Sequence, residues 1–97
     1  MAYDPGAIDA ALTAAIGDDP LLIADLRLAF RQGAARALGA MTSASDPEEW
    51  QAAAARLKGL AASFGAVRLM ALATEAAERA PGDAEMLRAL HRTLGRV

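Results

Sequence analysis

Aspartate is followed by proline three times in this sequence, at Asp4-Pro5, Asp19-Pro20 and Asp46-Pro47. An aspartate side chain accepts a hydrogen bond from a free backbone N–H at a helix start, and proline at the first helical position has no N–H to lose. Each pair therefore predicts the beginning of a helix. The turn Pro81-Gly82-Asp83 predicts one more start.

The residues between these starts favour helix over strand. Alanine and leucine together fill 40 of the 97 positions, whereas β-branched and aromatic residues are few. We expect helices near residues 5–16, 20–42, 47–64, 66–80 and 83–95. The chain is long enough for one small domain with its own core, so residues 1–97 are treated as a single domain.

Apolar residues recur at three- and four-residue steps in each of the four longer helices, which predicts a buried stripe along each. These stripes are Leu22, Leu26, Ala29, Phe30, Gly33, Ala37 and Met41; Trp50, Ala53, Ala54, Leu57, Leu60, Ala61 and Phe64; Leu69, Leu72, Ala73 and Ala76; and Leu87, Leu90 and Leu94. Short turns join the helices. The fold expected is therefore all-α: an antiparallel up-down-up-down four-helix bundle with a short additional N-terminal helix.

Composition excludes several classes of function. With no cysteine and one histidine, the chain predicts no disulfide, no metal site and no cofactor. A net charge of −2 argues against nucleic acid as a partner. A membrane span needs about twenty apolar residues, and no such run is present. No basic segment leads into an apolar run at the N-terminus, so the expected location is the cytoplasm.

One segment carries functional information: Ala55-Arg56-Leu57-Lys58-Gly59-Leu60-Ala61-Ala62-Ser63-Phe64-Gly65-Ala66. It resembles the core of histidine-containing phosphotransfer (HPt) domains, in which Leu-Lys-Gly follows a histidine and a second glycine comes six residues later. Leu57, Lys58, Gly59 and Gly65 stand at those spacings. Upstream, the segment 17–30 looks like the family's entry to its second helix, and residues 73–78 fit the helix after the second glycine. The likeness therefore covers about residues 15–94.

The likeness fails at one position. Where the family carries its phosphorylated histidine, this sequence has Ala55, whose methyl group has no lone pair with which to attack phosphorus. The resemblance therefore implies a degenerate HPt domain that binds without accepting phosphate, and we expect no enzymatic activity.

The helical pitch places position 55 opposite the expected apolar stripe, where it faces solvent among small residues. An exposed apolar strip on a charged protein is a candidate docking site. Gly59 is notable because glycine inside a helix costs about 0.5 to 1 kcal/mol relative to alanine, and Lys58 is the only lysine beside nine arginines. The predicted partner-binding residues are Gln51, Ala52, Ala55, Arg56, Lys58, Gly59 and Ala62.

The resemblance implies that the partner is the receiver domain of a response regulator or a sensor histidine kinase. We expect the chain to be a monomer rather than a homo-oligomer. Two alternatives stay open. The chain could carry phosphate on His91, its only imidazole, although the pattern around it favours a partly buried structural histidine. It could also be a helical self-association module unrelated to phosphorelays, in which the alanine-rich strip packs against its own copy.

Overall fold

A computed structural model describes residues 10, 12–15, 17 and 19–97. It contains four long helices: α2 (Pro20–Ser43), α3 (Pro47–Ser63), α4 (Val67–Ala76) and α5 (Ala84–Leu94). Residue 10 and residues 12–15 are helical as well, and precede α2. The all-α class, the four long helices and the short N-terminal helix are confirmed, whereas the expected start of that short helix at Asp4-Pro5 lies outside the described residues.

Aspartate caps three of the helix starts as predicted. The Asp19 carboxylate accepts hydrogen bonds of 3.1 Å from the backbone N–H groups of Leu21 and Leu22. Asp46 accepts from Glu49 N–H at 2.8 Å, and Asp83 from Met86 N–H at 2.9 Å. These bonds satisfy donors that have no partner inside the helix, so the sequence fixes where α2, α3 and α5 begin.

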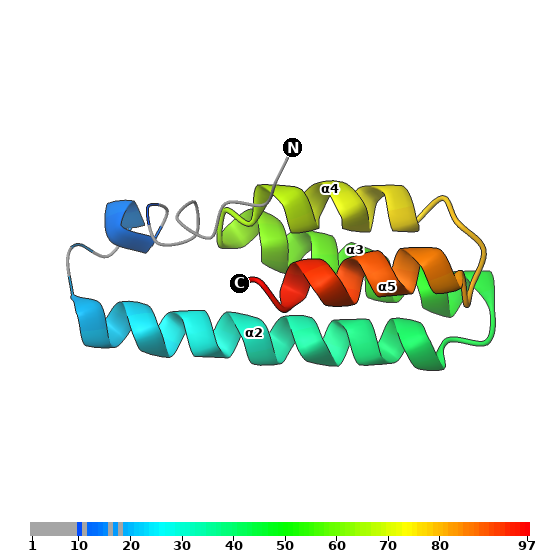
Figure 1. The fold of residues 1–97 in the computed structure, drawn as a ribbon, viewed down its shortest axis with the longest axis horizontal. Coiled ribbons are helices and arrows are strands. Elements are labelled where there is room, and N and C mark those ends of the chain that lie inside the picture. Colours follow the sequence, from blue (N-terminus) through cyan, green and yellow to red (C-terminus); the bar gives the residue numbers. More distant parts are fainter. Residues whose placement is uncertain (1–9, 11, 16, 18) are drawn as a thin grey trace.

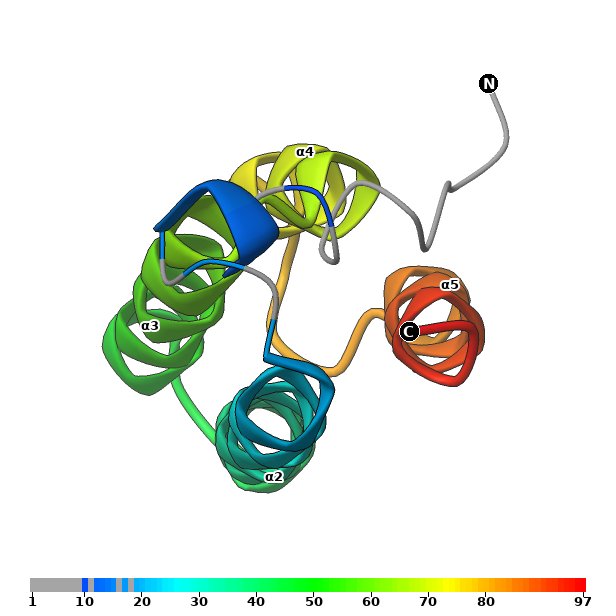
Figure 2. The same cartoon turned by 90° about the vertical axis from the view of Figure 1, so that its left-hand side faces the viewer.

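The four helices run alternately up and down, and α5 returns to pack beside α2 (Figure 1). Viewed from one end they form a ring, with the short N-terminal helix in front of it (Figure 2). Leu12 in that helix is only 6% exposed and joins the hydrophobic core. The short helix therefore covers one end of the core.

The core is built from buried residues of all four long helices, and in α2 these begin at Phe30. Its largest fully buried side chains are Trp50, Phe30, Leu38, Met41, Leu57, Leu69 and Leu90. The rings of Phe30 and Phe64 lie 5.0 Å apart between centroids and are tilted by 36°, an arrangement in which aromatic rings attract. Alanines between the large residues allow the helices to approach closely.

Gly65 closes α3, as its position predicts. Its φ of 71° lies in the left-handed region, which glycine adopts without the steric cost of a side chain. Ala66 N–H donates to Ala61 O at 2.8 Å and Gly65 N–H to Ala62 O at 3.3 Å, the two bonds of a Schellman motif. This compact turn brings α4 back against α3.

Three expectations about the helices are wrong in detail. Leu22 and Ala29, predicted to be buried, are exposed. For Leu22 the reason is length: α2 has 24 residues but α4 and α5 have 10 and 11, so the first turns of α2 extend past the ends of the other helices. Ala29 directly precedes the fully buried Phe30, so the helical pitch turns it about 100° away from the core. In addition, α4 ends at Ala76 rather than near residue 80, because the backbone of Glu78 and Arg79 tightens into bonds to residues three positions earlier.

Candidate protein docking face

The rotation of α3 about its own axis is set by what it buries. Trp50 is fully buried, and its indole N–H donates a 2.7 Å hydrogen bond to Ala76 O at the end of α4. On the side of α2, a Cβ added to Gly33 would lie 3.4 Å from a Leu60 methyl group, so the two helices meet closely there. With these contacts made, the opposite side of α3 must face solvent.

The start of α3 is held by a variant of a capping box, a motif in which the third residue of a helix accepts a hydrogen bond from the backbone N–H of the cap residue. In α3 the carboxylate of Glu49 accepts a long bond, 3.5 Å, from the N–H of Ser45, one residue before the cap Asp46. Glu48 and Glu49 both lie in the first turn, where negative charge is favoured by the helix dipole.

All of the predicted partner-binding residues lie on the solvent side of α3 and are exposed: Gln51, Ala52, Ala55, Arg56, Lys58, Gly59 and Ala62. The outward direction of position 55, derived from helical pitch, is confirmed. We call these seven residues the α3 face. Their role in binding a partner stays a prediction.

The α3 face can bind but has little chemistry to offer. Its centre is a methyl group at Ala55 and a bare backbone at Gly59, flanked by the cations Arg56 and Lys58. The nearby Ser63 hydroxyl donates to Gly59 O at 2.9 Å and thereby ties its proton to the helix backbone. A flat surface of small side chains flanked by two cations suits contact with an acidic protein surface rather than transfer of a chemical group.

Gly59 has no structural requirement within this chain. A Cβ built on it meets nothing within 4 Å, and positive φ among the described glycines is confined to Gly17, Gly65 and Gly82. Gly39 in α2 has a similar environment: it is exposed, and a Cβ built on it would also meet nothing within 4 Å. At Gly59 the missing side chain therefore leaves room on the outer surface and does not serve internal packing.

Replacing Gly59 with alanine should raise the free energy of unfolding. Because the new methyl group meets no atom and lowers the backbone entropy of the unfolded chain, we expect a gain of about 0.5 to 1 kcal/mol. Gly39→Ala is the matched control and should give the same gain. Urea denaturation of the two variants measures both; a loss of stability confined to Gly59→Ala would mean that the glycine is needed by the fold.

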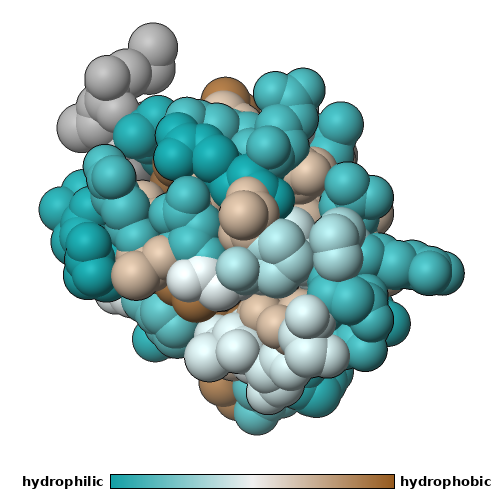
Figure 3. Space-filling model, turned by 90° about the vertical axis from the view of Figure 1, so that its right-hand side faces the viewer, coloured by the Kyte–Doolittle hydropathy of each residue, from teal (hydrophilic) through white to brown (hydrophobic). Residues whose placement is uncertain are grey.

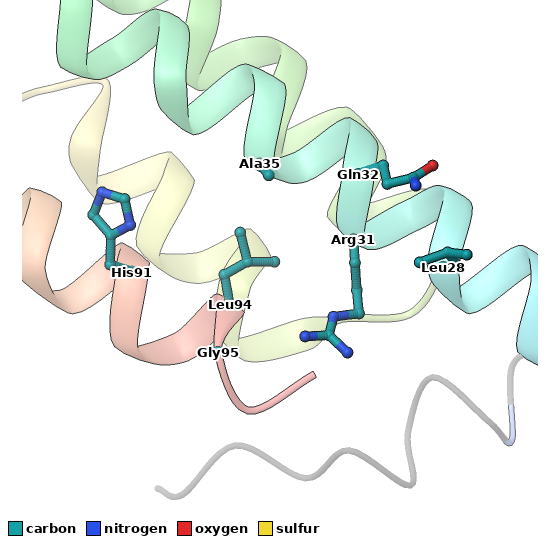
Figure 4. Close-up of a pocket in the computed structure, with 7 residues that line it drawn as sticks. All are labelled: Leu28, Arg31, Gln32, Ala35, His91, Leu94 and Gly95. Carbon is teal, nitrogen blue, oxygen red and sulfur yellow. The ribbon is translucent and has the colours of Figure 1, made fainter.

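His91 is exposed, so its interpretation as a partly buried structural histidine is wrong. The helix α5 buries Met86, Leu90 and Thr93, and one residue beyond Leu90 the chain has turned by about 100° away from the core. The imidazole lines an open groove between α2 and α5 (Figure 4). Sequence analysis did not find this groove. Leu28 on its α2 side stands outside the predicted buried stripe of that helix, and this departure from the periodicity could have indicated an exposed apolar site.

Glu75 and Arg79, four residues apart in sequence, form an ion pair with 2.9 Å between Oε1 and Nη2. Asp83 lies 3.5 Å from the same guanidinium. The hydrogen bond that Arg79 donates to Glu75 raises the pKa of Arg79 above its ordinary value. Both partners are well exposed, so the pair adds little stability.

No protein-family model, curated protein or solved structure matches this chain. None of the described helices is long and apolar enough to cross a membrane. Within the same residues, no three histidine or acidic side chains gather as a metal site would require.

Proposed function

We propose that this chain is an HPt-like signalling module of a two-component phosphorelay that binds a receiver domain or a sensor histidine kinase through the α3 face and accepts no phosphate. The observation that carries the proposal is the outward position of Ala55 beside Gly59 and Lys58, at the spacing of the family motif. The four-helix bundle, with the motif on α3, the second of its four long helices, agrees with it.

Such a module acts by mass action. A receiver whose active-site surface is covered by the α3 face cannot bind an active phosphotransfer protein at the same time. The chain therefore either lowers the rate of phosphate transfer by competition or acts as a scaffold that holds two partners together. The open space at Gly59 admits a partner's backbone, and the two flanking cations favour the acidic surface that surrounds a receiver's phosphorylation site.

A titration against receiver domains from the same genome tests the binding. Isothermal calorimetry with each receiver, with and without beryllofluoride, should find at least one complex in the micromolar range, which corresponds to about −8 kcal/mol. If every receiver and kinase stays unbound at high micromolar concentration, the proposal is wrong.

The exposure of His91 favours one second candidate, a carrier that accepts phosphate on this imidazole. We expect the opposite: incubation with a ³²P-phosphorylated receiver should leave the chain unlabelled, because no lysine or glycine follows His91 at the family's spacing. The control is His91→Ala. An acid-labile label on the natural chain that is lost in this variant would establish the carrier instead.

A further inference from the structure

We propose that the groove between α2 and α5 is a second docking site, which takes an acidic amphipathic helix from a partner protein. The groove has a volume of about 480 Å³ and is lined by Leu28, Arg31, Gln32 and Ala35 of α2 and by His91, Leu94 and Gly95 of α5. It lies on helices other than the one that bears the α3 face, so it goes beyond the function proposed above.

The groove lies at one end of a longer strip on one face of α2, in which Leu21, Leu28 and Ala35 are the apolar members. Its four lining residues on that helix stand at positions i, i+3, i+4 and i+7, the spacing of one helix face. Continuing the same spacing backwards reaches Leu21, which is 80% exposed, while Leu28 is 54% exposed. Leucines this open, aligned along one face, are typical of a surface that a partner covers.

The length of the groove suits a short stretch of helix. From Leu28 to Ala35 the strip extends by seven residues, or about 10 Å at the rise of a helix. In Figure 4 His91 lies toward one end of the groove and Leu28 toward the other, with Leu94 and Arg31 between them. A partner helix laid along the groove would bury apolar residues from about two of its turns there.

The charge of the rim points to an acidic occupant. Residues 26–45 and 86–97, which include the groove-lining parts of α2 and α5, carry six of the ten cations of the chain and no carboxylate side chain. Arg88 stands three residues before His91 and so lies along the same side of α5. Within the described part of the chain, neither Arg31 nor Arg88 makes an ion pair. Asp25 is the nearest acid in sequence, at the start of the strip.

The acids of the chain are concentrated elsewhere. Seven of the twelve lie in or beside the turns that follow α2 and α4: Asp46, Glu48, Glu49, Glu75, Glu78, Asp83 and Glu85. Both turns are at the same end of the bundle, whose surface is mainly hydrophilic (Figure 3). Among the residues that the structure describes, carboxylates thus gather at this end and cations on the α2–α5 flank, which directs an acidic partner to the groove.

The alternatives are less well matched. Nucleic acid favours aromatic side chains that stack on bases, and the groove lining has none besides His91. An anionic membrane favours a protruding apolar edge, whereas this apolar surface is a hollow between two helices. A helix with leucines toward the groove and glutamates toward the rim satisfies both the shape and the charge.

The test uses a fluorescent peptide of about 14 residues, four helical turns, with leucine on one face and glutamate on the other. Its control has lysine for every glutamate. We expect the acidic peptide alone to bind, and its anisotropy signal to weaken with added salt. Ala35→Glu and Arg31→Glu should each lower the affinity by about tenfold or more, while the matched exposed sites Ala71→Glu and Arg68→Glu on α4 leave it unchanged.

The single histidine supplies an internal reporter. The imidazole Hε1 resonance of His91 should shift during the peptide titration and stay in place when a receiver binds the α3 face, so the two proposals fail separately. Equal binding of the lysine peptide, or peptide binding that ignores Ala35→Glu and Arg31→Glu, overturns the groove proposal. So does binding of vesicles rich in phosphatidylserine, or of duplex DNA, in place of the acidic peptide.

Discussion

Ala55→Glu should abolish most of the receiver binding while leaving the bundle intact. A carboxylate at the centre of the α3 face would have to be desolvated against the acidic surface of a receiver, and like charges in an interface cost several kcal/mol. We expect the dissociation constant to rise about a hundredfold, equivalent to about 2.7 kcal/mol. The calorimetric titration described above measures the change.

The control for this variant is Ala71→Glu on α4, where an alanine is exposed in the same way. Both substitutions lie on helix surfaces, so each should change the free energy of unfolding by no more than about 0.5 kcal/mol. If Ala55→Glu binds receivers as the natural chain does, the α3 face is not the interface. If it abolishes a concentration-dependent rise in mass seen by sedimentation, the alternative of self-association is the correct one.

Trp50→Ala should have the largest effect on stability. The side chain is fully buried between α3 and α4, and its indole is the donor to Ala76 O. Removal leaves a large cavity and a buried carbonyl without its partner, which together cost about 3 to 5 kcal/mol. A loss of this size is a large fraction of the free energy of unfolding of a small domain.

Thermal denaturation followed by circular dichroism measures this loss, and Trp50→Phe separates its two causes. Phenylalanine refills part of the space but cannot donate to Ala76 O, so we expect an intermediate loss. A melting temperature unchanged in Trp50→Ala would contradict the packing of α4 against α3 and, with it, the rotation that turns Ala55 outward.

The starts of the long helices could be predicted because their determinants are local. Asp19, Asp46 and Asp83 each cap a helix within three residues, and Gly65 closes α3 through bonds to its own last turn. The same is true of the outward direction of Ala55, which follows from the pitch of one helix and a strong apolar stripe.

What sequence periodicity missed depends on distances between helices. Leu22 belongs to a regular stripe but is exposed because the neighbouring helices do not extend that far. His91 lies next to a buried leucine yet faces outward, into a groove whose other wall is on α2. Helix length sets the exposure of Leu22, and no local pattern encodes it. The outward direction of His91 follows from the pitch of α5, but the groove beside it depends on how α5 packs against α2.

The most direct test of the central claim is NMR mapping of the ¹⁵N-labelled chain against a receiver domain held in its active form by beryllofluoride. We expect the amide shifts to concentrate between residues 51 and 62, with Ala55 and Gly59 among the largest, and to vanish in Ala55→Glu. Shifts that gather on another helix, or a spectrum that no receiver changes at high micromolar concentration, would contradict the claim that the outer side of α3 is a phosphorelay docking surface.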